Sequence, residues 1–276
     1  MKRLCSLLLF VLLSFYGFAQ DLEYVTEKDI SYYPTASDNS DTYQAERCKL
    51  DIYYPKNQTS SSTIVWFHGG GLTGGDKEFP RELSNKGFIV IAVGYRLSPK
   101  AHVKDIIGDA AAAVAWTFKN ISKYGGNSKL IFVSGHSAGA YLDMMLTLDK
   151  RYLAKFDVDA DSIAGLVSFS GQAITHFTAR QEMGLKDIQP LIDELAPLYF
   201  VRSDAPPILL LTGDREFEML GRYEENAYLA RMLKLAGHKN TVLYELQGFG
   251  HDMVTPGIPL LIKEVNRISK EIKSNL

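Results

Sequence analysis

The strongest constraint on the fold is a series of short apolar runs that alternate with helical stretches along the chain. Each run is rich in Val, Ile and Leu and is flanked by glycine or polar residues, as is typical of strands that are covered on both faces. These runs are Thr63–Phe67, Gly87–Val93, Lys129–Ser134, Ile163–Phe169, Pro207–Thr212 and Asn240–Leu246. The alternation predicts an α/β fold with a mostly parallel central sheet flanked by helices.

Other stretches of the chain complete this arrangement. Apolar residues recur at three and four positions, as in amphipathic helices, in His102–Lys123, Ala138–Leu148, Tyr223–Leu235 and Ile258–Ile272. The segments Leu22–Tyr33 and Arg47–Tyr54 alternate as half-exposed strands do. Gly171–Pro206 is less regular, and we expect it to form a small cap-like insertion on the substrate side of the sheet.

The N-terminal residues have the composition of an export signal. Two cations precede an apolar run over Leu4–Phe18, and the small residues of Gly17–Ala19 stand at the expected cleavage spacing. The apolar run is shorter than the roughly 20 residues that span a bilayer, which disfavours a retained anchor. We therefore expect a signal peptide over residues 1–20, a single α/β domain over residues 21–276, and a secreted or periplasmic location.

Charge and cysteine content argue against several classes of function. The net charge is −2 at pH 7, and the cations are scattered, whereas nucleic-acid binders usually carry a basic patch. After signal removal Cys48 would be the remaining cysteine, so we expect a buried packing residue and no internal disulfide. Neither C-x-x-C nor H-E-x-x-H occurs. We therefore expect no nucleic-acid partner, no metal and no cofactor.

The central functional motif is Gly135–Gly139, with the sequence GHSAG. It follows the predicted strand Lys129–Ser134 and precedes the predicted helix Ala138–Leu148, which is the context of a nucleophile elbow. Glycines two residues on either side of Ser137 allow a sharp turn that projects the serine hydroxyl from the sheet. The N-terminus of the following helix favours developing negative charge. We therefore predict that Ser137 is a nucleophile.

A second motif, His68–Gly71 (HGGG), directly follows the predicted strand Thr63–Phe67. Consecutive glycines let the backbone approach a substrate and direct N–H groups toward it. Together with the N–H of Ala138, these groups would form an oxyanion hole for a tetrahedral intermediate. The alternative of a phosphate-binding loop is disfavoured because no Gly-Lys-Ser/Thr follows.

On a fold with a nucleophile elbow, the catalytic histidine follows the acid and stands late in the chain. His251 lies in a glycine-flanked loop after the last predicted strand, and we predict that it is the general base. We expect His136 to point away from Ser137 on the tight turn and His68 to brace its loop. The other histidines stand in polar stretches and are expected to be solvated: His102, His176 and His238.

The acid of the triad should lie just beyond the predicted strand Pro207–Thr212, in the loop Gly213–Glu218. A carboxylate in this loop would orient the imidazole and stabilise its protonated form. Asp214 is closest to the strand end, and Glu216 is one step farther along the loop. Either could instead cap the loop or pair with Arg215, so the residue pattern leaves both candidates open.

With these motifs the chain resembles bacterial α/β-hydrolase carboxylesterases that carry HGGG and GxSAG. This group includes hormone-sensitive-lipase-like esterases, kynurenine formamidases and acetylxylan or feruloyl esterases. The similarity extends through Leu50–Pro55, Tyr95–Pro99 and Tyr124–Asn127 to His251.

The resemblance implies the α/β-hydrolase fold and a set of site residues. Ser137 would be the nucleophile and His251 the base. The oxyanion donors would be the N–H groups of Gly70, Gly71 and Ala138. In such families the acid often stands three residues after the glycine that ends its strand, which favours Glu216 over Asp214.

Two departures from these families leave the substrate open. The loop after the acid-bearing strand lacks the Asp-Pro-Leu of hormone-sensitive-lipase relatives, and Leu72 stands where formamidases commonly have an aromatic residue. The export signal favours an ester outside the cytoplasm, such as an acetyl or feruloyl group on a polysaccharide. The alternatives are a small-molecule amidase or formamidase and a non-catalytic binding protein. The complete set of motif residues disfavours the binding protein.

Overall fold

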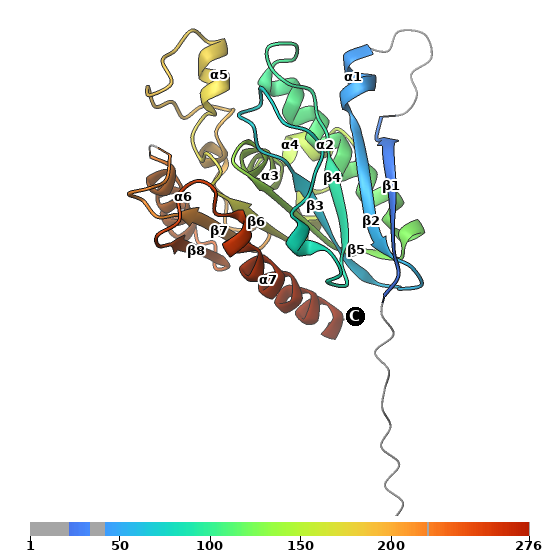
Figure 1. The fold of residues 1–276 in the computed structure, drawn as a ribbon. Helices are drawn as coiled ribbons and strands as arrows, with labels where there is room; N and C mark the ends of the chain where they lie inside the picture. The colour runs from blue at the N-terminus through green and yellow to red at the C-terminus, as the bar shows by residue number, and fades with distance from the viewer. Residues whose placement is uncertain (1–21, 34–41, 220, 276) are drawn as a thin grey trace, which may run out of the picture.

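The structure is a computed structural model that describes residues 22–33, 42–219 and 221–275. The predicted signal peptide, residues 1–20, lies outside the described residues. A single sheet of eight strands forms the centre of the molecule, with the order β1-β2-β4-β3-β5-β6-β7-β8 (Figure 1). Among the described residues, no helix is both long enough and apolar enough to cross a membrane.

All eight predicted strands are confirmed, with shifts of a few residues at their ends. They are β1 (Tyr24–Ser31), β2 (Lys49–Pro55), β3 (Ser61–Phe67), β4 (Ile89–Val93), β5 (Gly126–His136), β6 (Gly165–Phe169), β7 (Ile208–Gly213) and β8 (Thr241–Leu246). β2 pairs antiparallel with both β1 and β4, and every other pairing is parallel. The carboxyl ends of the parallel strands therefore meet at one edge of the sheet.

The four predicted helices are also confirmed, and within the described part of the chain three shorter ones accompany them. The helices are α1 (Thr42–Arg47), α2 (Val103–Asn120), α3 (Ala138–Leu148), α4 (Lys150–Ala154), α5 (Phe177–Glu182), α6 (Arg222–Leu235) and α7 (Val254–Ser274). Short 3-10 turns lie at Arg81–Leu83, Ile121–Tyr124, Ala160–Ser162 and Pro197–Phe200.

The sheet has an apolar core on each face because side chains alternate along a strand. In β3, Val65 and Phe67 belong to the core that includes α2, α3 and α6. The intervening Ile64 and Trp66 belong to the second core, which α7 covers. In Figure 1, α7 crosses one face of the sheet and α2 and α3 lie on the other. The fold is the expected α/β arrangement, with β5 buried at its centre.

The irregular segment 171–206 lies at the carboxyl edge of the sheet, beside the HGGG loop. It contains α5, which stands beyond the end of the sheet in Figure 1 (yellow). The Thr178 hydroxyl donates a hydrogen bond to the Gly71 carbonyl at 2.5 Å. A Cβ added to Gly71 would lie 2.9 Å from the ring of Phe177. The segment thus has the position expected of a cap-like insertion.

Candidate active site

Ser137 occupies a strained turn between β5 and α3. Its φ of 56° and ψ of −113° lie outside the regions that serine adopts readily, as in a nucleophile elbow. A Cβ on Gly139 would stand 2.1 Å from the Phe67 carbonyl oxygen, and one on Gly135 would stand 2.6 Å from the carbonyl carbon of Gly139. Both glycines are therefore needed for α3 to begin directly against the end of β3.

The HGGG loop lies beside this turn. A Cβ on Gly69 would be 3.5 Å from Cβ of Ser137, so the two motifs are in contact. Gly70 and Gly71 have φ values of 111° and 64°, a region that favours glycine. Ala138 is the first residue of α3, where an N–H has no partner within the helix. The structure thus places the HGGG loop and the start of α3 beside one serine.

His68 braces the glycine loop, as predicted. Its ring stacks on Tyr95 with centroids 4.2 Å apart, and its Nδ1 lies 2.6 Å from the Gly69 carbonyl oxygen. The Tyr95 hydroxyl donates to the His68 carbonyl at 2.7 Å. Burial lowers the pKa of His68 to about 4, so the ring is neutral at pH 7 and serves a structural role.

His251 lies in the loop after β8, and its Nδ1 is bonded to a carboxylate. The partner is Glu218, with Nδ1 and Oε1 2.5 Å apart. The Glu218 side chain is 1% exposed and that of His251 is 26% exposed. The Glu218 carboxylate also accepts from the N–H groups of Met219 and Gly213, each at 3.0 Å. The pair is therefore buried on the acid side and open to solvent on the imidazole side.

The environment of Glu218 keeps it ionised. Burial raises its pKa, but the hydrogen bond from His251 and the Met219 amide, with further contributions, bring the pKa down to about 2. A permanently charged carboxylate at Nδ1 fixes the tautomer of the imidazole and leaves Nε2 as the basic nitrogen.

Both predicted acids, Glu216 and Asp214, are wrong. The Asp214 carboxylate caps its own loop, accepting from the N–H of Glu216 at 3.0 Å and of Gly248 at 2.9 Å. The Glu216 side chain points into solvent. The Asp214 carbonyl accepts from the N–H of Glu218 at 2.8 Å, which closes a tight turn. That turn carries Glu218 back to the end of β7, which the neighbouring positions do not reach.

Only part of the signal for Glu218 is present in the sequence. An aspartate that bonds the N–H two residues on starts a turn, and residues four apart then lie on the same side of it. With Asp214 at the strand end, the residue that returns to this end is Glu218. Arg215 was a possible ion-pair partner for Asp214 or Glu216 in the sequence analysis; in the structure it pairs with Glu245 at 2.6 Å.

His136 ties the loop of His251 to the nucleophile turn. Its Nε2 lies 2.9 Å from the His251 carbonyl oxygen, and the two rings are 4.7 Å apart. Burial is the main cause that lowers the pKa of His136 to about 4. A neutral His136 can therefore donate to this carbonyl. Because Ser137 follows His136 in the chain, this contact ties the loop of His251 to the nucleophile turn.

The predictions for two other histidines are wrong. His176 and His238 are 1% and 6% exposed. The His176 ring caps α5 by accepting from the Thr178 N–H at 3.2 Å, and burial lowers its pKa well below the usual value. His238 bonds Thr241 Oγ1 at 2.6 Å. His102 is solvated as predicted, with a side chain that is 80% exposed, and Cys48 is buried as predicted.

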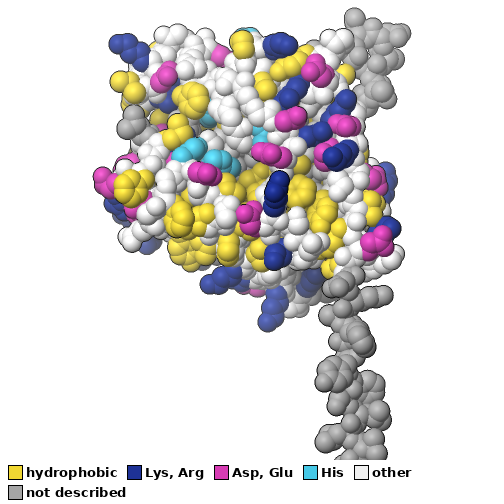
Figure 2. All heavy atoms as spheres, in the orientation of Figure 1, with side chains coloured by type: hydrophobic (Ala, Val, Ile, Leu, Met, Phe, Trp, Pro, Cys, Tyr) yellow, Lys and Arg dark blue, Asp and Glu magenta, His cyan; other side chains and the backbone are white. Residues whose placement is uncertain are grey.

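The surface around the site mixes histidine and apolar side chains. In Figure 2, histidines reach the surface on a face where hydrophobic side chains gather. Phe217, Met219 and Phe249, on the loops that carry Glu218 and His251, are 66%, 45% and 44% exposed. Within the described ranges, no group of three or more His, Cys, Asp or Glu side chains is arranged to hold a metal ion.

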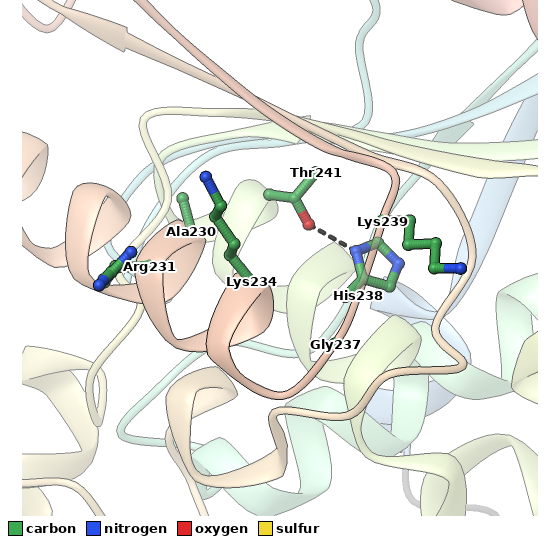
Figure 3. Close-up of a pocket in the computed structure, with 7 residues that line it drawn as sticks. All are labelled: Ala230, Arg231, Lys234, Gly237, His238, Lys239 and Thr241. Atoms are coloured by element: carbon green, nitrogen blue, oxygen red, sulfur yellow. Dashed lines mark hydrogen bonds between the residues drawn. The ribbon is translucent and has the colours of Figure 1, made fainter.

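A cavity of about 660 Å³ lies elsewhere, between α6 and the start of β8 (Figure 3). It is lined by Ala230, Arg231, Lys234, Gly237, His238, Lys239 and Thr241. Thr241 is the first residue of β8, so this cavity opens at the amino end of the strands. Ser137 and the Glu218–His251 pair lie at the carboxyl end, where ligands bind in open α/β sheets.

Comparisons with curated proteins agree with the motifs. The BD-FAE family model matches residues 50–220. The chain is 25% identical over 227 residues to the "Probable isoprenylcysteine alpha-carbonyl methylesterase" of Oryza sativa subsp. japonica, covering 72% of this chain and 53% of that protein. It is 28% identical over 228 residues to esterase LipC of Mycobacterium tuberculosis, covering 73% and 56%. The chain thus spans about half the length of the curated relatives it matches.

Solved structures share the fold. A truncated carbohydrate esterase from gut microbiota has a TM-score of 0.72 at 20% identity, covering 91% of this chain and 99% of that one. Esterase B from Lactobacillus rhamnosis has a TM-score of 0.70 at 17% identity, covering 93% and 89%. The fold is therefore that of the α/β-hydrolases.

Proposed function

The chain belongs to the BD-FAE family, and from this premise we propose that it is a serine carboxylesterase. The observation that carries the proposal is the hydrogen bond of 2.5 Å between His251 Nδ1 and Glu218 Oε1. This buried pair lies at the same edge of the sheet as the strained turn of Ser137. Its geometry is that of the base and acid of a triad on this fold.

In the first half of the proposed reaction, Ser137 Oγ attacks the carbonyl carbon of an ester. Nε2 of His251 takes the serine proton, and the imidazolium is stabilised by the Glu218 carboxylate at Nδ1. The N–H groups of Gly70, Gly71 and Ala138 would stabilise the oxyanion. His251 then gives its proton to the alcohol as the C–O bond breaks, leaving an acyl-serine.

In the second half, water replaces the alcohol. Nε2 of His251 takes a proton from the water as its oxygen attacks the acyl carbon, and the same N–H groups stabilise the second oxyanion. Return of the proton to Ser137 Oγ releases the carboxylic acid. Each step uses groups of this chain and needs no cofactor.

For the substrate, we propose an acyl ester carried on a carbohydrate, acetyl or feruloyl. One structural neighbour bears the name carbohydrate esterase, and the apolar side chains beside the site suit an acyl or aromatic group. The experiment is a comparison of kcat/KM on acetylated xylan, feruloylated oligosaccharide, short and long p-nitrophenyl esters, and N-formyl amides. A preference for N-formyl amides would favour the amidase alternative and contradict the proposed substrate.

We also propose that the protein is exported, on the basis of the N-terminal composition. Fractionation of expressing cells, followed by N-terminal sequencing of the recovered protein, tests this proposal. A mature chain that begins near residue 21 outside the cytoplasm is the expected result. A full-length chain retained in the cytoplasm would contradict it.

The activity itself is tested by Ser137→Ala. This variant should lose about 10⁶-fold in kcat on p-nitrophenyl acetate, as removal of a triad nucleophile does. Ser134→Ala is the matched control, because Ser134 is buried on β5, just before the turn of Ser137, and its hydroxyl donates to the Val167 carbonyl. A folded Ser137→Ala protein that keeps the wild-type rate would overturn the proposed function.

A further inference from the structure

A second serine, Ser170, contacts the imidazole of the Glu218–His251 pair. Ser170 directly follows β6, and its hydroxyl oxygen is 3.0 Å from Nδ1 of His251. The residue is 0% exposed, so substrate cannot reach it. Its contact with the nitrogen that also binds Glu218 sets it apart from the structural serines of the sheet.

The backbone of Ser170 is held in an unusual conformation. Its φ is 53°, in the left-handed region where glycine carries less strain than serine. Its N–H donates to the Leu211 carbonyl at 2.7 Å, and its carbonyl accepts from Nη1 of Arg222. Arg222 is itself 2% exposed. The chain thus fixes Ser170 between β7 and a buried guanidinium.

The available protons determine what the Ser170 hydroxyl can do. The single proton on Nδ1 of His251 is directed at Glu218, 2.5 Å away, so the Ser170 hydroxyl does not donate to this nitrogen. Burial raises the pKa of Glu218, and hydrogen bonds from His251, the Met219 amide and Ser170 lower it. The oxygen of Ser170 can at the same time accept part of the Nδ1–H bond.

We propose that Ser170 is a positioning residue that keeps the His251 imidazole aligned with the Glu218 carboxylate during turnover. This inference rests on the proposed esterase function. A glycine would adopt the same φ with less strain, so the hydroxyl is what serine contributes here. Because the hydroxyl lies 3.0 Å from Nδ1 of His251, its loss lets the ring rotate about its Cβ–Cγ bond and out of line with the Glu218 carboxylate.

The test compares Ser170→Ala and Ser170→Gly with the control Ser168→Ala. Ser168 is also 0% exposed and lies on β6, but its hydroxyl donates to the Ala140 carbonyl at 3.2 Å, away from the pair. The readouts are kcat and KM on p-nitrophenyl acetate, the free energy of unfolding in urea, and the far-downfield proton resonance of the His251 Nδ1–H.

Both Ser170 variants should lower kcat about tenfold to a hundredfold, the range for a lost hydrogen bond to a charged group, with KM within about twofold. The Nδ1–H resonance should shift or broaden in both. Ser168→Ala should leave kcat and the resonance unchanged. Because Ser170→Gly removes the backbone strain as well as the hydroxyl, equal losses in the two variants would assign the effect to the hydroxyl.

The inference is overturned if Ser170→Ala or Ser170→Gly keeps the wild-type kcat and resonance. It is also overturned if neither variant folds while Ser168→Ala does, since Ser170 would then be structural. Failure of the proposed function is a separate outcome, in which Ser137→Ala keeps its activity. If Ser137→Ala is inactive and the Ser170 variants behave as wild type, the esterase function stands and the positioning role does not.

Discussion

Replacement of Glu218 by glutamine is the sharpest perturbation of the proposed mechanism. The substitution preserves size and removes one charge from a side chain that is 1% exposed. Glutamine can still accept from one of the N–H groups of Met219 and Gly213, so the turn should persist. What it cannot do is stabilise the His251 imidazolium that forms as Ser137 gives up its proton.

The size of the effect follows from the carboxylate's environment. The pKa of Glu218 is lowered from 4.5 to about 2, and each pKa unit corresponds to about 1.4 kcal/mol of interaction with the charged form. The charged carboxylate is therefore favoured by roughly 3 kcal/mol in the resting protein, and a loss of that size in the transition state corresponds to a fall of about 10²–10³ in kcat. Loss of the correct tautomer could extend this to about 10⁴.

The assay is steady-state hydrolysis of p-nitrophenyl acetate at pH 7 by Glu218→Gln, Glu216→Gln and Asp214→Asn. Glu216→Gln alters a solvent-exposed side chain and should stay within about twofold of wild type. Asp214→Asn keeps one acceptor for the loop and should lose only a few-fold. A loss at Glu216 or Asp214 that exceeds the loss at Glu218 would refute the reasoning.

Further predictions concern stability and the loops around the site. Because the folded pKa of Glu218 lies below its ordinary value, its contribution to stability is present above about pH 4.5 and is lost as pH falls toward 2. The free energy of unfolding in urea should therefore fall more steeply with decreasing pH in wild type than in Glu218→Gln. Parallel pH curves would contradict this prediction. Gly139→Ala should lower the free energy of unfolding by about 1–3 kcal/mol or more, because its Cβ would stand 2.1 Å from the Phe67 carbonyl oxygen; an unchanged urea midpoint would contradict that packing. Thr178→Val should lower stability by about 1 kcal/mol through loss of its bond to the Gly71 carbonyl, measured in the same way, and Thr178→Ser should retain most of it.

The sheet could be predicted because its evidence is local. Each buried strand is a short β-branched run between glycines or polar residues; the HGGG motif directly follows β3, and the GHSAG motif begins in the last two residues of β5. A parallel sheet then brings the ends of those strands together without further information. For this reason Ser137, the glycine loop and His251 could be predicted as site residues from their places in the chain.

The acid could not be assigned in the same way, because its position depends on how one loop turns. Asp214, Glu216 and Glu218 lie within five residues, and any of them could be near the end of β7. The choice depends on whether Asp214 uses its carboxylate to cap the turn, which involves the Gly248 N–H from a distant loop. Chain order cannot reveal such a contact.

The buried histidines were mispredicted for a related reason. A polar neighbourhood in sequence favours exposure only when the ring's partners are water. His176 accepts from the backbone N–H of Thr178, and both ring nitrogens of His238 have partners, the Thr241 hydroxyl and the Ala205 carbonyl, so protein groups replace water at these rings. The two threonines are two and three residues away, but the burial of both rings depends on elements that pack over them.

The central claim is that Ser137 is activated by His251 and Glu218, and covalent labelling tests it most directly. The protein would be treated with a fluorophosphonate, digested, and mapped by mass spectrometry, with His251→Ala and Glu218→Gln treated in parallel. The account predicts one adduct on Ser137, formed far more slowly in both variants. An adduct on a different residue, or labelling of Ser137 at the wild-type rate without His251, would contradict it.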